Sequence, residues 1–249
     1  MTRREFATLM AATALTTVLM TGTTTPAKAM DVSPMVSKIT PSGGGSSYRM
    51  TVRNDSATPA TVEIETYRMQ VDETGARSLV EEDKDILVFP VQSVIPPNRE
   101  QVIQVRYTGD AAEEGRMYLV RAAQLPINMQ TTPTEGGAGA DVQVAFTINT
   151  YVFVAPPRAR AEIEVTTVSR AANGDVVLTA RNSGTGFAYI RESRIILKTA
   201  DGQSHEVPAA DVDVGQVSVI AGGATRQVKI PAALAASASG ALTASIVLL

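Results

Sequence analysis

The chain has 249 residues, of which 44% are apolar and 19% charged, and its formal net charge is −3. This length is enough for two ordinary domains with their own cores. The absence of cysteine excludes disulfides, thiolate metal sites and cysteine nucleophiles, and the mildly acidic balance argues against nucleic-acid binding. Abundant Val, Ile and Thr, with only 4% aromatic residues, favour strands. We therefore expect an all-β protein.

Residues 1–29 have the pattern of an export signal. A pair of arginines is followed by an apolar, Thr-rich stretch over about 7–20 and by the cleavage motif Ala27-Lys28-Ala29. The arginine pair is also similar to a twin-arginine signal, so the general and the twin-arginine export routes both stay open. No later segment has the roughly 18 consecutive apolar residues of a membrane span. We expect a mature chain that starts at Met30 and lies in the periplasm without stable membrane insertion.

Short strands separated by turn residues are predicted along the first half of the mature chain. Val62 and Ile64 share one face of a predicted strand, and Ile103, Val105 and Tyr107 share a face of another. Their spacing is typical of a β-sandwich. The predicted strands cover 48–53, 61–69, 86–89, 101–107 and 116–123.

A Gly/Thr-rich loop over 131–140 is followed by an uninterrupted segment, 141–155, which is far longer than an ordinary strand. Pro156-Pro157 ends this segment, because proline cannot donate to a strand ladder. We place the domain boundary there, giving domains 30–156 and 157–249. The second set of predicted strands covers 161–169, 176–181, 189–199, 217–220, 227–230 and 241–249.

The segment 141–155 alternates in a way that groups its apolar side chains. In a strand, alternate residues share a face, which puts Val142, Val144, Phe146 and Ile148 in one row. One interpretation is an ordinary core strand with one buried face. The other is an edge strand that offers its backbone and its apolar row to another protein by strand addition.

Several motifs, none of them strong alone, occur in an order that resembles a known family. The chain is similar, over essentially the whole mature length, to the PapD-like periplasmic chaperones of the chaperone–usher pilus pathway. The motifs are Ile39-Thr40-Pro41, Ile86 to Pro90 followed by Val94 to Pro97, Gln104-Val105-Arg106, Arg116 to Val120 with Gln124 to Pro126, the long strand before Pro156, and Asn182-Ser183-Gly184 with Phe187 to Ile190.

The resemblance implies two immunoglobulin-like sandwiches in an L or boomerang shape. It implies a chaperone and not an enzyme, with no cofactor, whose long strand completes the fold of a pilus subunit and which passes that subunit to an outer-membrane usher. The donor residues would be Val142, Val144, Phe146 and Ile148. Self-association through the same strand is a further expectation.

Two positions depart from the family pattern. The family usually has an Arg and a Lys in the cleft between the domains, which anchor the terminal carboxylate of the subunit. The Arg position falls on Ser37, with Lys38 beside it, and the Lys position falls on Tyr151. Lys38 and Tyr151 are therefore the candidate anchor; the alternatives are a solvated surface charge for Lys38 and a packed hinge aromatic for Tyr151.

Two other functions are compatible with an exported β-sandwich protein. A structural or adhesive fibre subunit would need a short donor extension ahead of a single incomplete domain. A secreted hydrolase with a catalytic triad would have to use His205, the only histidine, which we expect on the surface of a hairpin loop.

Overall fold

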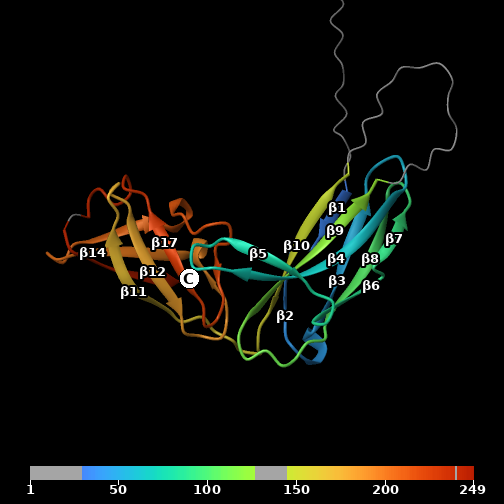
Figure 1. Ribbon diagram of the computed structural model, residues 1–249, viewed down its shortest axis with the longest axis horizontal. Helices are drawn as coiled ribbons and strands as arrows, with labels where there is room; N and C mark the ends of the chain where they lie inside the picture. Colours follow the sequence, from blue (N-terminus) through green and yellow to red (C-terminus); the bar gives the residue numbers. More distant parts are fainter. Residues whose placement is uncertain (1–29, 127–144, 239) are drawn as a thin grey trace, which may run out of the picture.

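The computed structural model describes residues 30–126, 145–238 and 240–249. Figure 1 shows two all-β lobes at an angle to each other, with a long hairpin of β4 (Ala60–Val71) and β5 (Arg77–Glu81) reaching from the first toward the second. Besides strands, the described residues form only three short 3-10 helices, none of which is long and apolar enough to span a bilayer. The two-sandwich, L-shaped fold class is confirmed. The expected export signal lies outside the described residues.

The first sandwich consists of two facing sheets. Its other strands are β1 (Met30–Ser33), β2 (Val36–Ile39), β3 (Ser47–Asn54), β6 (Ile86–Phe89), β7 (Gln92–Ile95), β8 (Arg99–Tyr107), β9 (Arg116–Leu125) and β10 (Thr147–Val154). One sheet has the order β1-β3-β8-β6 and the other the order β2-β10-β9-β4-β5, with β7 paired to β4. The opening stretch of chain joins both sheets, since β1 pairs antiparallel with β3 and β2 pairs parallel with β10.

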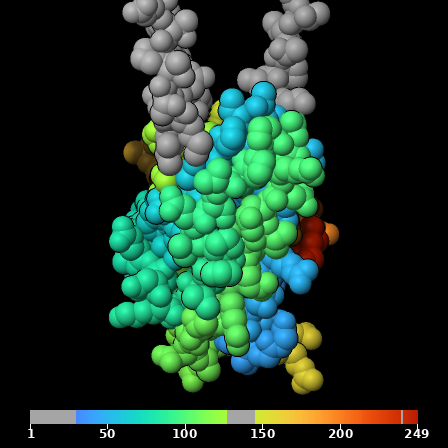
Figure 2. All heavy atoms as spheres, turned by 90° about the vertical axis from the view of Figure 1, so that its right-hand side faces the viewer, coloured from blue at the N-terminus to red at the C-terminus, as the bar shows by residue number. Residues whose placement is uncertain are grey.

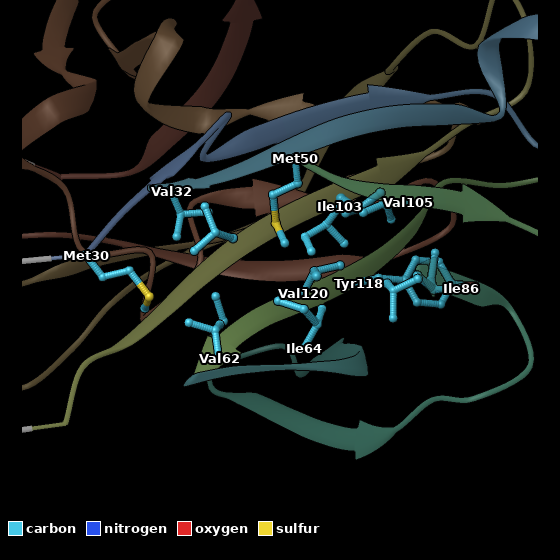
Figure 3. Close-up of a cluster of buried hydrophobic side chains, with 14 of the residues drawn as sticks. Met30, Val32, Met50, Val62, Ile64, Ile86, Ile103, Val105, Tyr118 and Val120 are labelled. Carbon is cyan, nitrogen blue, oxygen red and sulfur yellow. The ribbon is translucent and has the colours of Figure 1, made fainter. Parts of the chain in front are cut away.

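Alternating apolar side chains from both sheets form the core of this sandwich (Figure 3). As the sequence pattern predicts, Val62 and Ile64 point inward from β4. Ile103, Val105 and Tyr107 point inward from β8. Removal of such side chains from water is worth roughly 1.5 to 3 kcal/mol each, so the core supplies the stability that disulfides provide in many exported domains.

The second sandwich is built from shorter sheets around its own core. Its strands are β11 (Ile163–Arg170), β12 (Val176–Asn182), β13 (Ala188–Tyr189), β14 (Ser193–Thr199), β15 (Ser204–Pro208), β16 (Val219–Ile220), β17 (Thr225–Ile230) and β18 (Leu242–Leu248). The sheets have the orders β11-β12-β17, β13-β16 and β15-β14-β18. The domain boundary at Pro156 stays a prediction, although a turn does follow the prolines there.

A buried asparagine organises a turn in the second sandwich. Asn182 has no exposed surface, and its side-chain amide donates to the Gly186 and Ile220 carbonyls at 3.0 Å each. Its side-chain oxygen accepts from the backbone N–H of Glu162 and Gly184. Four bonds satisfy this polar group completely, which is the condition for burying it without cost. The motif Asn182-Ser183-Gly184 therefore forms a hydrogen-bonded turn.

The strands differ from the expectations at several places. The predicted strand 189–199 is interrupted by a 3-10 helix, Ile190–Glu192. Strands β1, β2, β5, β7 and β15 have no counterpart among the predicted ranges, because each is a short run of mixed polar and apolar residues, unlike the equally short but wholly apolar β6. The expectation that His205 lies in a hairpin loop is wrong: it belongs to β15, opposite Leu197, and its Nε2 is buried.

The face of the first sandwich that points away from the second carries exposed apolar side chains. Figure 2 shows this side of the molecule, with β6, β7 and β8 toward the viewer. Phe89 is 74% exposed and Leu87 56% exposed, and Val94 and Val102 are also exposed. These residues lie on β6 and β8 of one sheet and on β7 of the other, at the end of the first sandwich far from the second (Figure 1).

Candidate functional site

Strand β10, the segment singled out in the sequence, has two different halves. Tyr151–Val154 has neighbours on both sides, β9 on one and β2 on the other. Thr147–Thr150 pairs with β9 alone among the described residues. Of the expected strand 141–155, residues 141–144 lie outside the described residues and Thr147–Val154 is observed as a strand. The expectation of an open edge is wrong for Tyr151–Val154, which pairs with β2.

The backbone of the first half of β10 presents polar groups to the open side. In an antiparallel ladder the N–H and C=O of one residue point to the same neighbour and alternate along the strand. Phe146 accepts a bond from the Gln124 N–H of β9 at 2.8 Å, whereas Tyr151 donates to Met35 on the β2 side at 2.9 Å. Thr147 and Asn149 thus point their N–H and C=O groups away from β9, beyond the end of β2. Among the described residues no strand pairs with this side of the edge.

The expected donor residues divide between described and undescribed positions. Thr150, Val152 and Val154 point into the core and are fully buried. Ile148 and Phe146 continue the same row and are only partly buried, packed against the rim of the core. Val142 and Val144 lie outside the described residues. The parity assigned from the sequence therefore holds for the half of the row that the structure describes.

The opposite face of the same sheet carries a polar network beside the open edge. Arg121 lies between Glu65 and Asn149 in the strand register. Its guanidinium donates to Asn149 Oδ1 at 3.0 Å and to Glu65 Oε2 at 3.2 Å. The hydroxyl of Tyr67 donates to Glu65 at 2.7 Å, and this bond to a carboxylate raises the pKa of Tyr67. The network ties Asn149 to the two inner strands of the sheet.

An apolar cluster fills the junction between the two sandwiches. Phe153 of β10 packs edge-on against Phe187, with ring centres 5.0 Å apart, and against Tyr189 at 6.2 Å. Met69 and Met117 join the cluster from the first sandwich, and Val219 from the second. The end of β10 is thereby fixed against the second sandwich, while its beginning stays at an edge.

Lys38, one of the two anchor candidates, lies at this junction. It is opposite Phe153 in the β2–β10 register, and its Nζ is 4.3 Å from the centre of the Tyr189 ring. Such a cation–π contact holds the ammonium group without neutralising its charge. Lys38, Phe153, Phe187 and Tyr189 line an open pocket of about 190 Å³. Lys38 is exposed and also contacts Tyr189 of the second sandwich, so its role as an anchor and its interpretation as a solvated surface charge both stay predictions.

Tyr151, the other anchor candidate, bonds to a residue that the sequence did not indicate. Arg77 of β5 donates from its guanidinium to the Tyr151 hydroxyl at 2.9 Å, and the contact is exposed to solvent. Tyr151 pairs with Val36, two residue pairs from Lys38 along β10 and β2. The sequence analysis did not name Arg77 as a candidate, because Arg77 reaches β10 only when the β4–β5 hairpin folds back.

Ser37, where the family pattern has an arginine, is buried instead of facing the cleft. It lies near the Tyr48 hydroxyl, which is itself buried. Burial raises the pKa of Tyr48 to about 12, against the lowering effect of the Thr150 and Ser37 hydroxyls.

Comparisons with known proteins find likeness in structure alone. No protein-family model and no curated protein matches the sequence. The class 5 fimbriae chaperone CfaA matches with a TM-score of 0.56 and 14% identity, covering 79% of this chain and 83% of that chain. The E. coli chaperone DraB matches with a TM-score of 0.52 and 16% identity, covering 82% and 86%.

A third solved structure is a complex. It is the pre-assembly complex of the chaperone CsuC and the tip adhesion subunit CsuE, from archaic chaperone–usher Csu pili of Acinetobacter baumannii, with a TM-score of 0.51, 14% identity and coverage of 82% and 87%. At these identities the likeness concerns the fold. The resemblance inferred from the sequence is confirmed at that level: this chain has the two-domain immunoglobulin-like architecture of the PapD-like pilus chaperones.

Proposed function

We propose that this protein is a periplasmic chaperone that binds pilus subunits by lending them a strand. The observation that carries the proposal is the open edge at Thr147–Thr150, which has β9 on one side and no described strand on the other. An unpaired edge is normally covered or blunted in stable proteins. Here the edge is held rigid by the ladder to β9 and is ready for β-strand addition.

Two kinds of interaction would hold the subunit. The outward N–H and C=O groups of Thr147 and Asn149 would pair with a subunit strand, which tolerates many sequences. The apolar row of Val142, Val144, Phe146 and Ile148 would fill the groove that the missing strand leaves in the subunit. Four such side chains contribute roughly 6 to 12 kcal/mol before ordering costs are subtracted.

The anchor for the subunit's terminal carboxylate would be formed by Lys38 and Tyr151. Arg77 adds a second cation, since its guanidinium bonds to the Tyr151 hydroxyl. An exposed Lys and Arg attract a carboxylate by charge, and arginine also offers paired donors that match its two oxygens. This arrangement would replace the Arg–Lys pair that is usual in the family.

The cellular setting completes the proposal. The export signal expected over 1–29 would bring the chain to the periplasm, where the captured subunit would be passed to an outer-membrane usher. A fibre subunit with a single incomplete domain is a poorer explanation, because this chain has two sandwiches, each with its own core.

Phe146→Asp tests strand donation most directly. We expect it to lower capture of a co-expressed pilus subunit that lacks its own donor segment by more than tenfold. The loss follows because an apolar contact of about 1.5 kcal/mol or more is replaced by a charge that must be desolvated. Soluble complex recovered from the periplasm by affinity purification is the readout.

Thr147→Asp is the matched control, since this neighbour is exposed and points to the opposite face. It introduces the same charge and should leave capture within a few-fold of the original. Thermal unfolding of both variants checks that the first sandwich remains folded. Equal capture by the original chain and a folded Phe146→Asp variant would rule out donation by this strand.

A further inference from the structure

The tip of the β4–β5 hairpin belongs to the first sandwich but is bonded to the second. The Glu73 carbonyl accepts from the Gln227 N–H of β17 at 2.7 Å, and the Gly75 carbonyl accepts from the Gln216 N–H at 3.0 Å. The side-chain oxygen of Gln216 in turn accepts from the Arg77 N–H at 3.2 Å. Three hydrogen bonds thus connect a five-residue stretch to the other sandwich.

Two glycines meet at this contact. A Cβ on Gly75 would lie 2.2 Å from the Val214 carbonyl oxygen, and a Cβ on Gly215 would lie 2.5 Å from the Thr74 carbonyl oxygen. Both distances are impossible for real atoms, and the obstacles are backbone atoms that cannot rotate away. Each position therefore admits only glycine while the two sandwiches keep their present orientation.

The hairpin also leads back to the cleft. Arg77, just beyond the tip, donates through its backbone to Gln216 of the second sandwich and through its guanidinium to Tyr151 of β10. Val71 and Leu79, on the two arms of the hairpin, pack into the apolar cluster at the junction. The hairpin therefore touches the second sandwich, the junction and the end of β10 at once.

We propose that the β4–β5 hairpin is a strut that sets the angle between the two sandwiches, with Gly75 and Gly215 as its positioning residues. The strut keeps Tyr189 of the second sandwich over Lys38 of the first, and so fixes the spacing of the cleft. Any effect of the hairpin on subunit capture rests on the proposed function. Its effect on the angle between the sandwiches is independent of that function and can be measured on the free protein.

The chain offers a closely matched control for a Gly75 variant. The turn 72–76 has backbone bonds from Asp72 N–H to the Ala76 carbonyl and from Gly75 N–H to the Asp72 carbonyl. The turn 199–203 repeats both bonds, and its Gly202 has the same φ of 85° as Gly75. A Cβ on Gly202 would meet nothing within 4 Å. Gly202→Ala thus carries the same backbone strain without the collision.

The experiment uses pairs of spin labels, because the chain has no cysteine of its own. Cysteines at the exposed positions Glu100 and Lys198 place one label on each sandwich, and pulsed electron spin resonance gives their distance distribution. Gly75→Ala should shift and broaden this distribution, Gln216→Ala should do so to a smaller degree, and Gly202→Ala should leave it as in the parent.

An unchanged distribution in Gly75→Ala would overturn the strut. If Gly75→Ala fails to fold, Gly215→Ala makes the reciprocal collision from the other sandwich and must give the same shift. A shift in Gly202→Ala equal to that in Gly75→Ala would also overturn the proposal, since strain in a turn would then explain both. Failure of strand donation in the Phe146→Asp experiment would leave this result unaffected.

Discussion

At the scale of single residues, Tyr48 shows how burial controls ionisation beside β10. Its hydroxyl is buried near Ser37 and Thr150, and burial raises its pKa to about 12. The ordinary value in an unfolded chain is about 10. A pKa that is raised on folding contributes stability that is complete below the unfolded value and is lost as the pH rises through the folded value. The relevant window is therefore pH 10 to 12.

Tyr48→Phe tests this directly, because phenylalanine cannot ionise. Between pH 9 and pH 11 the free energy of unfolding of the parent should fall by about 1 kcal/mol more than that of the variant. Urea unfolding at the two pH values measures the difference. Parallel loss of stability in both proteins would show that Tyr48 does not contribute.

Single residues of the cleft were only partly predictable. Lys38 and Tyr151 could be proposed from their positions relative to Pro41 and Pro156, and the structure places both at the junction. Arg77 and Arg121 could not be proposed, since their contacts depend on which strands are neighbours and in what register. A sequence pattern gives the face of a strand but not the partner across it.

At the scale of elements, the first half of β10 needs support that the second half obtains from β2. Asn149 is bonded to Arg121, which is bonded to Glu65. Thr150 donates to the Val120 carbonyl at 2.9 Å inside the core. These contacts keep the register of a strand that has one neighbour.

Arg121→Ala should loosen this half of β10. A hydrogen bond from a charged group contributes roughly 1.5 kcal/mol or more, so amide exchange at Ile148 and Thr150 should accelerate about tenfold. Arg49→Ala, an exposed arginine on the other sheet, serves as the control. Unchanged exchange in Arg121→Ala, as in the control, would mean that packing of Ile148 and Phe146 alone holds the register.

The elements themselves were predicted best where alternation was long. The pattern found β6 with the observed bounds and β3, β4, β8 and β9 within a few residues. It missed β1 (MDVS) and β2 (VSKI), because each mixes polar and apolar residues over four positions, whereas the equally short β6 (ILVF) is wholly apolar. For β10 it included residues 145, 146 and 155, which lie outside the observed strand, while 141–144 lie outside the described residues. Apolar periodicity does not report which neighbour a strand has.

At the scale of the whole molecule, the arrangement combines a fixed end and an open end of one strand. The end of β10 is fixed by Phe153 against Phe187 and Tyr189 and is flanked by β2. The hairpin strut, if it sets the angle of the sandwiches, fixes the same end from the other side. A client strand would then bind to an edge whose position relative to the cleft is already determined, which lowers the ordering cost of binding.

Residue-resolved amide exchange of β10, with and without a bound pilus subunit that lacks its donor segment, tests the central claim most directly. Thr147 and Asn149 point their N–H groups to the open side, so they should exchange quickly in the free protein and become protected in the complex. Ile148 and Thr150, which face β9, should be protected in both states and act as internal references. Slow exchange of Thr147 and Asn149 in the free protein, or fast exchange in the complex, would contradict the account.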